Sequence, residues 1–247
     1  MPDTKALVRA DVLLVARGLM PTRAKARTAI EAGLVTSQGQ LIAKPAQMLA
    51  PDCPLQASLA HPWVSRAALK LIAALDQFAV SVTDRFCLDI GASTGGFTQV
   101  LLARGARHVV AVDVGRDQLD KGLAADPRVT PLEGQDARTL TRDDLGQLPP
   151  DLVVMDVSFI GIEKILPHVL TILPAHLDLI ALVKPQFQAG PARVGKRGIV
   201  AADTARLVAE EVSALVEGLG GLHVLAMTDS PITGSDGNHE FLLHARR

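Results

Sequence analysis

The chain has 247 residues, which is room for one large domain or for an ordinary domain with a small one. Apolar residues make up 48% and aromatic residues 3%, so the core must be aliphatic. No stretch approaches the roughly 18 uninterrupted apolar residues that a membrane span needs, and the two cysteines fit a reducing cytoplasm and no metal-binding spacing. We therefore predict a cytoplasmic protein without a membrane span or a metal.

The charge of the chain is unevenly distributed. Residues 1–60 hold seven Lys and Arg against four Asp and Glu, a balance of +3. Because the whole chain has 25 bases and 26 acids, residues 61–247 hold 18 bases and 22 acids, a balance of −4. A basic segment attached to a mildly acidic body suggests a module that binds a polyanion.

The basic segment is predicted to hold two short helices followed by two short strands. Residues 9–33 carry apolar side chains at helical spacing, with Thr22 as N-cap of the second helix, and the strands follow within 34–43. Arg23 and Arg27 lie four residues apart and share one helix face, where their guanidinium groups suit phosphate oxygens. From charge alone, the alternative is an ordinary solvated helix face.

The order of residues in this segment resembles the RNA-binding domain named after ribosomal protein S-four. The similarity covers about residues 5–60, and Thr22 stands where that family usually has serine. The resemblance implies binding to structured RNA through basic side chains. The residues predicted to make these contacts in the segment are Arg9, Arg17, Arg23, Lys25 and Arg27.

Three prolines separate the basic segment from a larger domain. We predict an RNA-binding domain at 1–60, a linker at 61–64 and the larger domain at 65–247. The larger domain is predicted to begin with a helix, which places Arg66 and Lys70 one turn apart.

The most informative part of the larger domain runs from Cys87 to Phe97. An apolar run with one acid, Asp89, leads into a turn of the order Gly-x-x-x-Gly-Gly, which opens a predicted helix. A second apolar run ends in Asp113, whose carboxylate can accept hydrogen bonds from ribose hydroxyls. Because this is not the Gly-x-Gly-x-x-Gly order of a pyrophosphate cradle, we predict a site for an adenosyl group without phosphates, such as S-adenosylmethionine. The predicted cofactor-binding residues are Asp89, Gly91, Ala92, Ser93, Gly95, Gly96, Phe97, Asp113 and Asp136, although Asp89 alternatively only shapes the turn.

Strands and helices alternate through the rest of the chain. Further strands are predicted at 129–136, 151–159, 177–183, 223–227 and 240–244, with a helix at about 203–219. This alternation predicts an α/β class fold, a Rossmann-like and mostly parallel seven-stranded sheet with helices on both faces. Ligands bind beyond the carboxyl ends of such strands. Five charged residues would cluster there: Asp89, Asp113, Asp136, Asp156 and Lys184.

Four residues carry a resemblance to the FtsJ-like ribose 2′-O-methyltransferases, which use a Lys-Asp-Lys-Glu tetrad. The matching residues are Lys70 in Ser-Arg-x-x-x-Lys-Leu, Asp156 after the fourth strand, Lys184 in Leu-Val-Lys-Pro and Glu240 in Asn-His-Glu-Phe-Leu. Together with the basic segment, the whole chain resembles the TlyA family, whose members bear a hemolysin name and methylate cytidine ribose in small- and large-subunit ribosomal RNA. The resemblance implies S-adenosylmethionine as cofactor, ribosomal RNA as partner, the four matching residues as catalytic, and a basic loop that closes over substrate. Arg66, Lys196 and Arg197 complete the predicted RNA-binding residues.

The roles of these residues stay partly open. Lys184 can take the proton of the ribose 2′-hydroxyl, or it can stay charged and stabilise the developing alkoxide. Asp156 and Glu240 would orient the two lysines. Each also has a structural alternative, Asp156 as the cap of a helix after Gly161 and Glu240 as a partner of Arg246.

Other classes of protein explain less of the sequence. A nicotinamide-dependent dehydrogenase shares the glycine turn and the terminal acid but leaves the basic segment and the tetrad unexplained. A base methyltransferase needs prolines after the fourth strand or a cysteine nucleophile, and the sequence supplies neither there. A catalytically inactive RNA-binding protein and a cytolysin, as the hemolysin name suggests, remain as alternatives.

Overall fold

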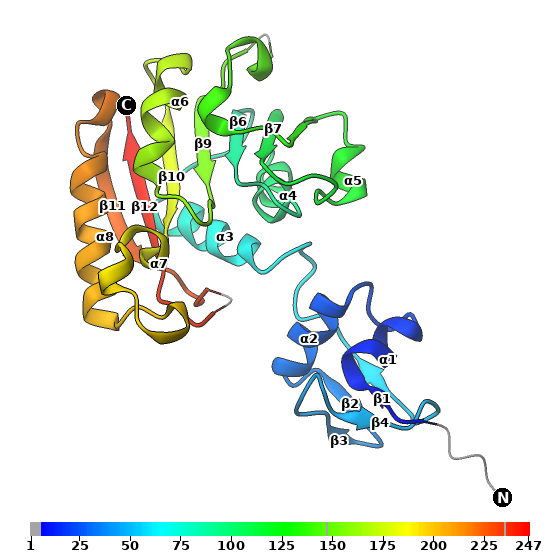
Figure 1. The fold of residues 1–247 in the computed structure, drawn as a ribbon. Coiled ribbons are helices and arrows are strands. Elements are labelled where there is room, and N and C mark those ends of the chain that lie inside the picture. Colours follow the sequence, from blue (N-terminus) through cyan, green and yellow to red (C-terminus); the bar gives the residue numbers. More distant parts are fainter. Residues whose placement is uncertain (1–5, 147, 235) are drawn as a thin grey trace, which may run out of the picture. The chain divides into compact units, whose positions relative to one another are not determined.

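The structure, a computed structural model, describes residues 6–146, 148–234 and 236–247. The chain forms two compact units, Met1–Pro62 and Trp63–Arg247, and each unit has a hydrophobic core of its own. Figure 1 shows the smaller unit in blue to cyan and the larger one in cyan to red.

The smaller unit packs two helices against short strands (Figure 1). As predicted, the Thr22 hydroxyl caps the second helix by accepting a hydrogen bond from Lys25 N at 3.2 Å. The predicted helices and the predicted pair of strands are present, and the other strands, of two residues each, are too short to leave an alternating pattern. The elements are α1 (Ala10–Ala16), α2 (Arg23–Glu31), β1 (Val8–Arg9), β2 (Val35–Ser37), β3 (Gln40–Leu41), β4 (Met48–Leu49) and β5 (Gln56–Ala57).

The larger unit is built on a seven-stranded sheet of order β11-β12-β10-β9-β6-β7-β8. β12 runs antiparallel to both of its neighbours, and the pairs from β10 to β8 are parallel. The predicted fold class, a mostly parallel Rossmann-like sheet, is confirmed. The strands are β6 (Phe86–Ile90), β7 (His108–Asp113), β8 (Val129–Glu133), β9 (Leu152–Met155), β10 (Asp178–Val183), β11 (His223–Asp229) and β12 (Phe241–Arg246).

Helices cover both faces of this sheet. One core lies between the sheet and helices α3 and α4, and contains Leu71, Leu101 and Cys87. The other lies between the sheet and helices α6 and α8, and contains Leu88 and Val208. Cys87 and Leu88 belong to opposite cores because successive side chains of a strand point to opposite faces. The helices are α3 (Ala67–Gln77), α4 (Gly96–Ala103), α5 (Lys121–Ala124), α6 (Leu166–Ile172), α7 (Pro185–Gln188) and α8 (Ala202–Val216).

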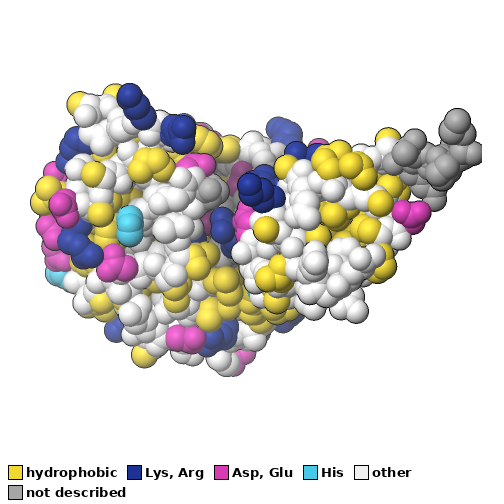
Figure 2. All heavy atoms as spheres, turned by 90° about the horizontal axis from the view of Figure 1, so that it is seen from below, with side chains coloured by type: hydrophobic (Ala, Val, Ile, Leu, Met, Phe, Trp, Pro, Cys, Tyr) yellow, Lys and Arg dark blue, Asp and Glu magenta, His cyan; other side chains and the backbone are white. Residues whose placement is uncertain are grey.

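The parallel strands end together at one edge of the sheet, as the fold requires. β6, β7, β9 and β10 are followed there by the glycine turn, Asp113, Asp156 and Lys184. Figure 2 looks onto the protein from this side, and the larger unit, on the left, shows basic and acidic side chains mixed with hydrophobic ones. This mixture is unlike the uniform apolar face that a membrane or a tightly packed partner would cover.

Candidate active site

Glycines let three elements meet at this edge. Gly91 follows β6 with a φ of +84°, and a Cβ there would stand 2.7 Å from the main-chain oxygen of Asp156. Gly96 opens α4, and a Cβ there would overlap the hydroxyl of Ser65. The first contact sets the end of β9 against the glycine turn, and the second sets the start of α3 against it. Without a side chain at either position, the fold can bring Asp156 and Lys70 to the same site.

A cavity of about 320 Å³ lies here, and all four residues of the predicted tetrad line it. They form two ion pairs: Lys70 Nζ lies 2.5 Å from Glu240 Oε2, and Lys184 Nζ lies 2.6 Å from Asp156 Oδ1. Lys70, Lys184 and Glu240 are only 7%, 8% and 4% exposed. Buried ion pairs contribute little net stability, because desolvation offsets their attraction. Two of them in one cavity therefore indicate chemistry more than folding.

Two further polar side chains complete the cavity. Lys184 Nζ donates to Ser158 Oγ at 3.0 Å, and Gln186 Nε2 donates to Glu240 Oε1 at 3.3 Å. An ammonium group has three N–H bonds, so Lys184 keeps one for a ligand after binding Asp156 and Ser158. Ser158 and Gln186 were not predicted as site residues from the sequence. The only signal for them in the sequence is that each stands two residues after a member of the tetrad.

The structural alternatives for the tetrad carboxylates are wrong. The helical turn after Gly161 (Ile162–Lys164) has no side-chain cap, and Asp156 pairs with Lys184 instead. Arg246 donates from Nε to Asp178 at 2.9 Å, which leaves Glu240 to Lys70.

A second cavity of about 620 Å³ adjoins the first, since both are lined by Gly91, Ser93, Asp156, Ser158 and Phe159. Its remaining lining combines polar residues at the ends of β7 and β8 with aliphatic side chains. The aliphatic lining residues include Ile90, Val112, Val157, Ile160 and Ile165.

Asp113 and Asp136, two of the predicted cofactor-binding residues, both line this second cavity. Asp113 accepts hydrogen bonds from Ser93 N at 2.8 Å and Gly115 N at 2.7 Å, one on each carboxylate oxygen. A second lone pair on each oxygen remains for ribose hydroxyls. Asp136 is bound by Arg138, whose side-chain hydrogen bonds hold the pKa of Asp136 below its ordinary value.

Asp89 lies apart from the other predicted cofactor residues. It is fully buried, lines neither cavity, and accepts a hydrogen bond from the Thr98 hydroxyl at 2.6 Å. Its other carboxylate oxygen has no hydrogen-bond partner among the residues that the structure describes. Burial raises the pKa of Asp89 to about 7. This geometry agrees with the alternative in which Asp89 shapes the glycine turn and does not contact the cofactor.

Some residues of the glycine turn line the first cavity, and Gly95 only shapes the turn. Gly91, Ala92, Ser93, Gly96 and Phe97 line the first cavity. Gly95 lines neither cavity; it adopts a φ of +93°, and a Cβ there would overlap the side chain of Leu123.

The two cavities fit an adenosyl group that carries a sulfonium. The larger one offers aliphatic walls for a flat ring beside a carboxylate with unused lone pairs, at Asp113. The smaller one offers two ammonium and two carboxylate groups at the junction, where a reacting group would lie. Because this ligand has no phosphates, its site needs neither a helix N-terminus nor a cluster of basic side chains to bind a pyrophosphate.

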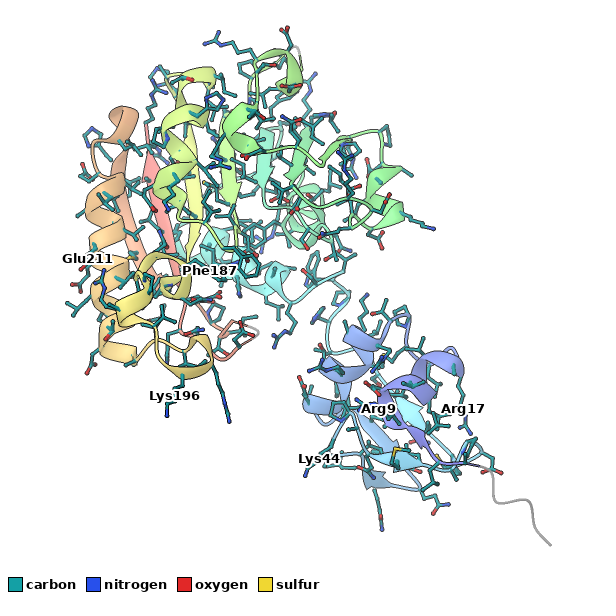
Figure 3. The ribbon with its side chains drawn as sticks, in the orientation of Figure 1. Arg9, Arg17, Lys44, Phe187, Lys196 and Glu211 are labelled. Carbon is teal, nitrogen blue, oxygen red and sulfur yellow. The ribbon has the colours of Figure 1, made fainter. Side chains whose placement is uncertain are left out.

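An aromatic pair stands beside the first cavity. Phe159 and Phe187 both line it, and their ring centroids are 4.9 Å apart. Phe159 is 90% exposed and has a φ of +66°, a conformation that is uncommon for a bulky residue. Figure 3 shows Phe187 on α7, the short helix that begins directly after Lys184. The sequence predicted Phe159 as the end of a strand, so its exposure was missed.

Predicted RNA-binding residues of the larger unit are exposed. Arg66 lines the first cavity from the start of α3. Lys196 and Arg197 lie in a short 3-10 turn after α7 (Lys196–Gly198), and Lys196 projects away from the ribbon in Figure 3.

In the smaller unit, a buried carboxylate organises two of the predicted arginines. Asp11 is 0% exposed and binds Arg9 Nε at 3.0 Å and Arg23 Nη2 at 2.9 Å. Hydrogen bonds from Arg9, opposed by burial and reinforced by Arg23, hold the pKa of Asp11 well below its ordinary range. The guanidinium of Arg17 instead donates to the main-chain oxygens of Pro51 and Cys53, so Arg17 has a structural role as well. Lys25 and Arg27 lie on α2, half-buried and exposed respectively.

Fold and site together define a methyltransferase-type Rossmann-like protein with a small basic unit before it. The family model of the FtsJ-like methyltransferases matches residues 63–247, and that of the S4 domain matches residues 8–52. The 16S/23S rRNA (cytidine-2′-O)-methyltransferase TlyA of Mycobacterium tuberculosis is 43% identical over 242 residues, 96% of this chain and 89% of that protein. The chain therefore belongs to the TlyA family of FtsJ-like methyltransferases.

Other relatives carry the hemolysin name. Hemolysin A of Brachyspira hyodysenteriae is 36% identical over 239 residues, 96% of this chain and 99% of that protein. A solved structure of a Streptococcus thermophilus protein with a hemolysin name has a TM-score of 0.77 at 40% identity, and covers 99% of this chain and 90% of that one. Among the described residues of this chain, no helix is both long and apolar enough to cross a membrane.

Proposed function

We propose that the protein transfers a methyl group from S-adenosylmethionine to the 2′-hydroxyl of a cytidine in ribosomal RNA. The observation that carries this proposal is the convergence of Lys70, Asp156, Lys184 and Glu240 as two ion pairs in one cavity, with all but the half-buried Asp156 shielded from solvent. The printed function of the mycobacterial relative, a 16S/23S rRNA cytidine-2′-O-methyltransferase, supports the choice of substrate.

The second cavity would hold the cofactor, which supplies an electrophilic methyl group when bound. Asp113 would accept hydrogen bonds from the ribose hydroxyls, and the aliphatic walls would enclose the adenine. Gly91 and Ser93 of the glycine turn line both cavities. This chain's contribution is then to hold the methyl donor in line with the acceptor, which by itself accounts for several kcal/mol of a barrier.

Lys184 is the residue that we assign to the 2′-oxygen. In its ion pair with Asp156 the ammonium has donors only, so an N–H of Lys184 would bind the 2′-oxygen and stabilise its developing negative charge. The oxygen would take the methyl group from the sulfonium, and the hydroxyl proton would pass to solvent water. Lys70 and Glu240, tied to each other and to Gln186, would form the opposite wall and exclude water.

The aromatic pair offers a place for the target base. A base has a flat apolar face, and stacking on an aromatic side chain gains about 1–3 kcal/mol. Phe159 is exposed at the cavity that holds Lys184 and is backed by Phe187. A nucleotide stacked there would present its ribose to the tetrad, while the smaller unit and the basic turn hold flanking phosphates.

The test is to incubate the protein with methyl-labelled S-adenosylmethionine and separated ribosomal subunits, then digest the RNA to nucleosides. We expect label in 2′-O-methylcytidine. Label on a base, or no label with either subunit, contradicts the proposal, and the second result leaves an inactive RNA-binding protein as the better description.

A further inference from the structure

Asn238 joins two segments that are far apart in the sequence. Its Oδ1 accepts a hydrogen bond from Val200 N at 2.9 Å, and its Nδ2 donates to Gly198 O at 2.9 Å. These partners fix the orientation of the amide, since one is a donor and the other an acceptor. Asn238 is 1% exposed, its bond to Val200 N is buried and its bond to Gly198 O is partly buried, and it stands two residues before Glu240.

The segment that Asn238 holds is a tight basic turn. Gly195 N donates to Ile199 O at 2.8 Å, and a Cβ on Gly195 would stand 2.9 Å from that same oxygen. Arg197, at the tip, has a φ of +64°, which a bulky residue adopts only where its surroundings impose it. The turn is therefore a defined structure that needs support from outside.

The two charged side chains of this turn are available for a ligand. Lys196 and Arg197 are exposed, and neither makes an ion pair with any residue in the described part of the chain. Arg193, three residues earlier, differs because Glu211 of α8 binds both of its terminal nitrogens at 2.9 and 2.8 Å. Figure 3 shows Lys196 pointing away from the ribbon and Glu211 on α8.

The other end of the same segment is tied to the site. Gln186 of α7 donates to Glu240, and Gln186 lies two residues after Lys184. The stretch from α7 to Val200 is thus fastened twice to the chain just before β12, at Glu240 and at Asn238. These two attachments fix the position of the basic turn relative to the tetrad.

We propose that Asn238 is a positioning residue that holds the Lys196–Arg197 turn in register with Glu240, so that the turn binds an RNA phosphate at a fixed distance from the reacting ribose. This rests on the proposed function. Asn238 touches neither cavity, and Glu240 has its own partners in Lys70 and Gln186. Loss of the Asn238 side chain therefore releases the turn and leaves the tetrad paired.

The first test needs no activity. Trypsin cleaves after Lys and Arg only where the chain is mobile, so in the full-length protein Asn238→Ala should speed cleavage after Lys196 and Arg197 at least about tenfold. Cleavage after Lys121, on α5, should not change and serves as the control within the same chain. Unchanged cleavage at the turn overturns the proposal, whether or not the protein methylates RNA.

The second test is a mutant cycle with ribosomal subunits as the RNA. Asn238→Ala should raise KM for subunits about tenfold, keep kcat within about twofold, and lower the salt dependence of binding as Lys196→Ala with Arg197→Ala does. Adding Asn238→Ala to that double variant should change KM no further, because the contacts it organises are already gone. If the increases in KM of Asn238→Ala and of the double variant multiplied in the triple variant, or if Asn238→Ala lowered kcat alone, Asn238 would instead have a general role in folding.

Asn238→Asp separates release of the turn from general unfolding, which S-adenosylmethionine affinity reports. Aspartate keeps the acceptor for Val200 N but sets a second acceptor against Gly198 O, so trypsin cleavage at the turn and KM should rise at least as far as in Asn238→Ala. An Asp variant with wild-type cleavage at the turn and unchanged S-adenosylmethionine affinity would also count against the proposal. Absence of transfer by the wild-type protein would instead defeat the proposed function and leave the trypsin result to decide on Asn238.

Discussion

The two lysines of the first cavity are held differently, and the difference bears on their roles. Lys70 meets Glu240, whose other carboxylate oxygen accepts from Gln186, so both oxygens of Glu240 are occupied. Lys184 is shared between Asp156 and Ser158, and both of these residues line the second cavity too. Lys184 therefore lies where a methyl donor and an acceptor would meet.

Lys184→Ala should lower kcat for RNA methylation at least about a hundredfold, because one preorganised donor to a developing charge is worth that much. Affinity for S-adenosylmethionine, measured by calorimetry, should change less than about threefold. Lys121→Ala removes an exposed lysine of the same unit and should match wild type. Lys184→Arg separates the two roles: retained transfer fits a charged group, and complete loss with normal cofactor binding fits a base.

Asp89 predicts a pH dependence of stability. Its pKa of about 7 in the folded protein lies above the ordinary value of about 4, so between these pH values the folded protein keeps a proton that the unfolded chain releases. The free energy of unfolding should therefore fall as pH rises from about 4 to about 7. Asp89→Asn cannot ionise and should show a smaller fall between pH 5 and pH 8 in urea unfolding. An identical fall in both proteins would show that Asp89 is ionised throughout.

Single residues were predictable where a local pattern surrounds them. The tetrad members came from short matching segments, and Asp113 from its place after a strand. Ser158, Phe159 and Gln186 have no such pattern, because a lone polar or aromatic residue in a loop is decided by tertiary packing. The same limit applies to Arg17, which the resemblance to the RNA-binding domain suggested as an RNA contact and whose guanidinium binds main-chain oxygens.

At the scale of elements, the long alternating segments were predictable and the short ones were not. The central strands β7, β9 and β10 follow from apolar runs of four or more residues, which are typical of buried parallel strands. Helices α5 and α7 have four residues each, too few to show a helical period. Yet α7 places Gln186 and Phe187 at the site, so a missed element carried part of the function.

The turn after β6 depends on glycine for two reasons that a matched pair of variants can separate. Gly91 and Gly218 have φ values of +84° and +79°, but only at Gly91 would a Cβ meet backbone, the carbonyl of Asp156. Gly218→Ala should cost about 1–2 kcal/mol of unfolding free energy, for conformation alone. Gly91→Ala should cost about 1–3 kcal/mol more, for overpacking, and should weaken cofactor binding. If denaturant unfolding gave the same loss of free energy for both variants, the backbone at Asp156 would be able to move away from the added Cβ without cost.

The molecule consists of two units with separate hydrophobic cores, so substitutions on the surface of one unit should leave the other folded. Arg23→Ala with Arg27→Ala should weaken binding to ribosomal subunits and reduce the slope of log affinity against log salt by roughly 1–2, since each phosphate contact contributes about 0.7–0.9. S-adenosylmethionine affinity should be unchanged. Arg128→Ala removes an exposed arginine directly before β8, at the amino end of that strand, and is the control. An unchanged slope would mean that these arginines meet something other than phosphate.

The position of β12 has a consequence for how the protein is made. β12 is synthesised after β11 but lies between β11 and β10, and Glu240 directly precedes it. A nascent chain therefore exposes the edge of β10, and leaves Lys70 without its carboxylate, until β12 has been translated. The smaller unit can fold long before then, since domains generally fold as units during synthesis. Newly made molecules thus pass through a stage in which the smaller unit is complete and the tetrad is not.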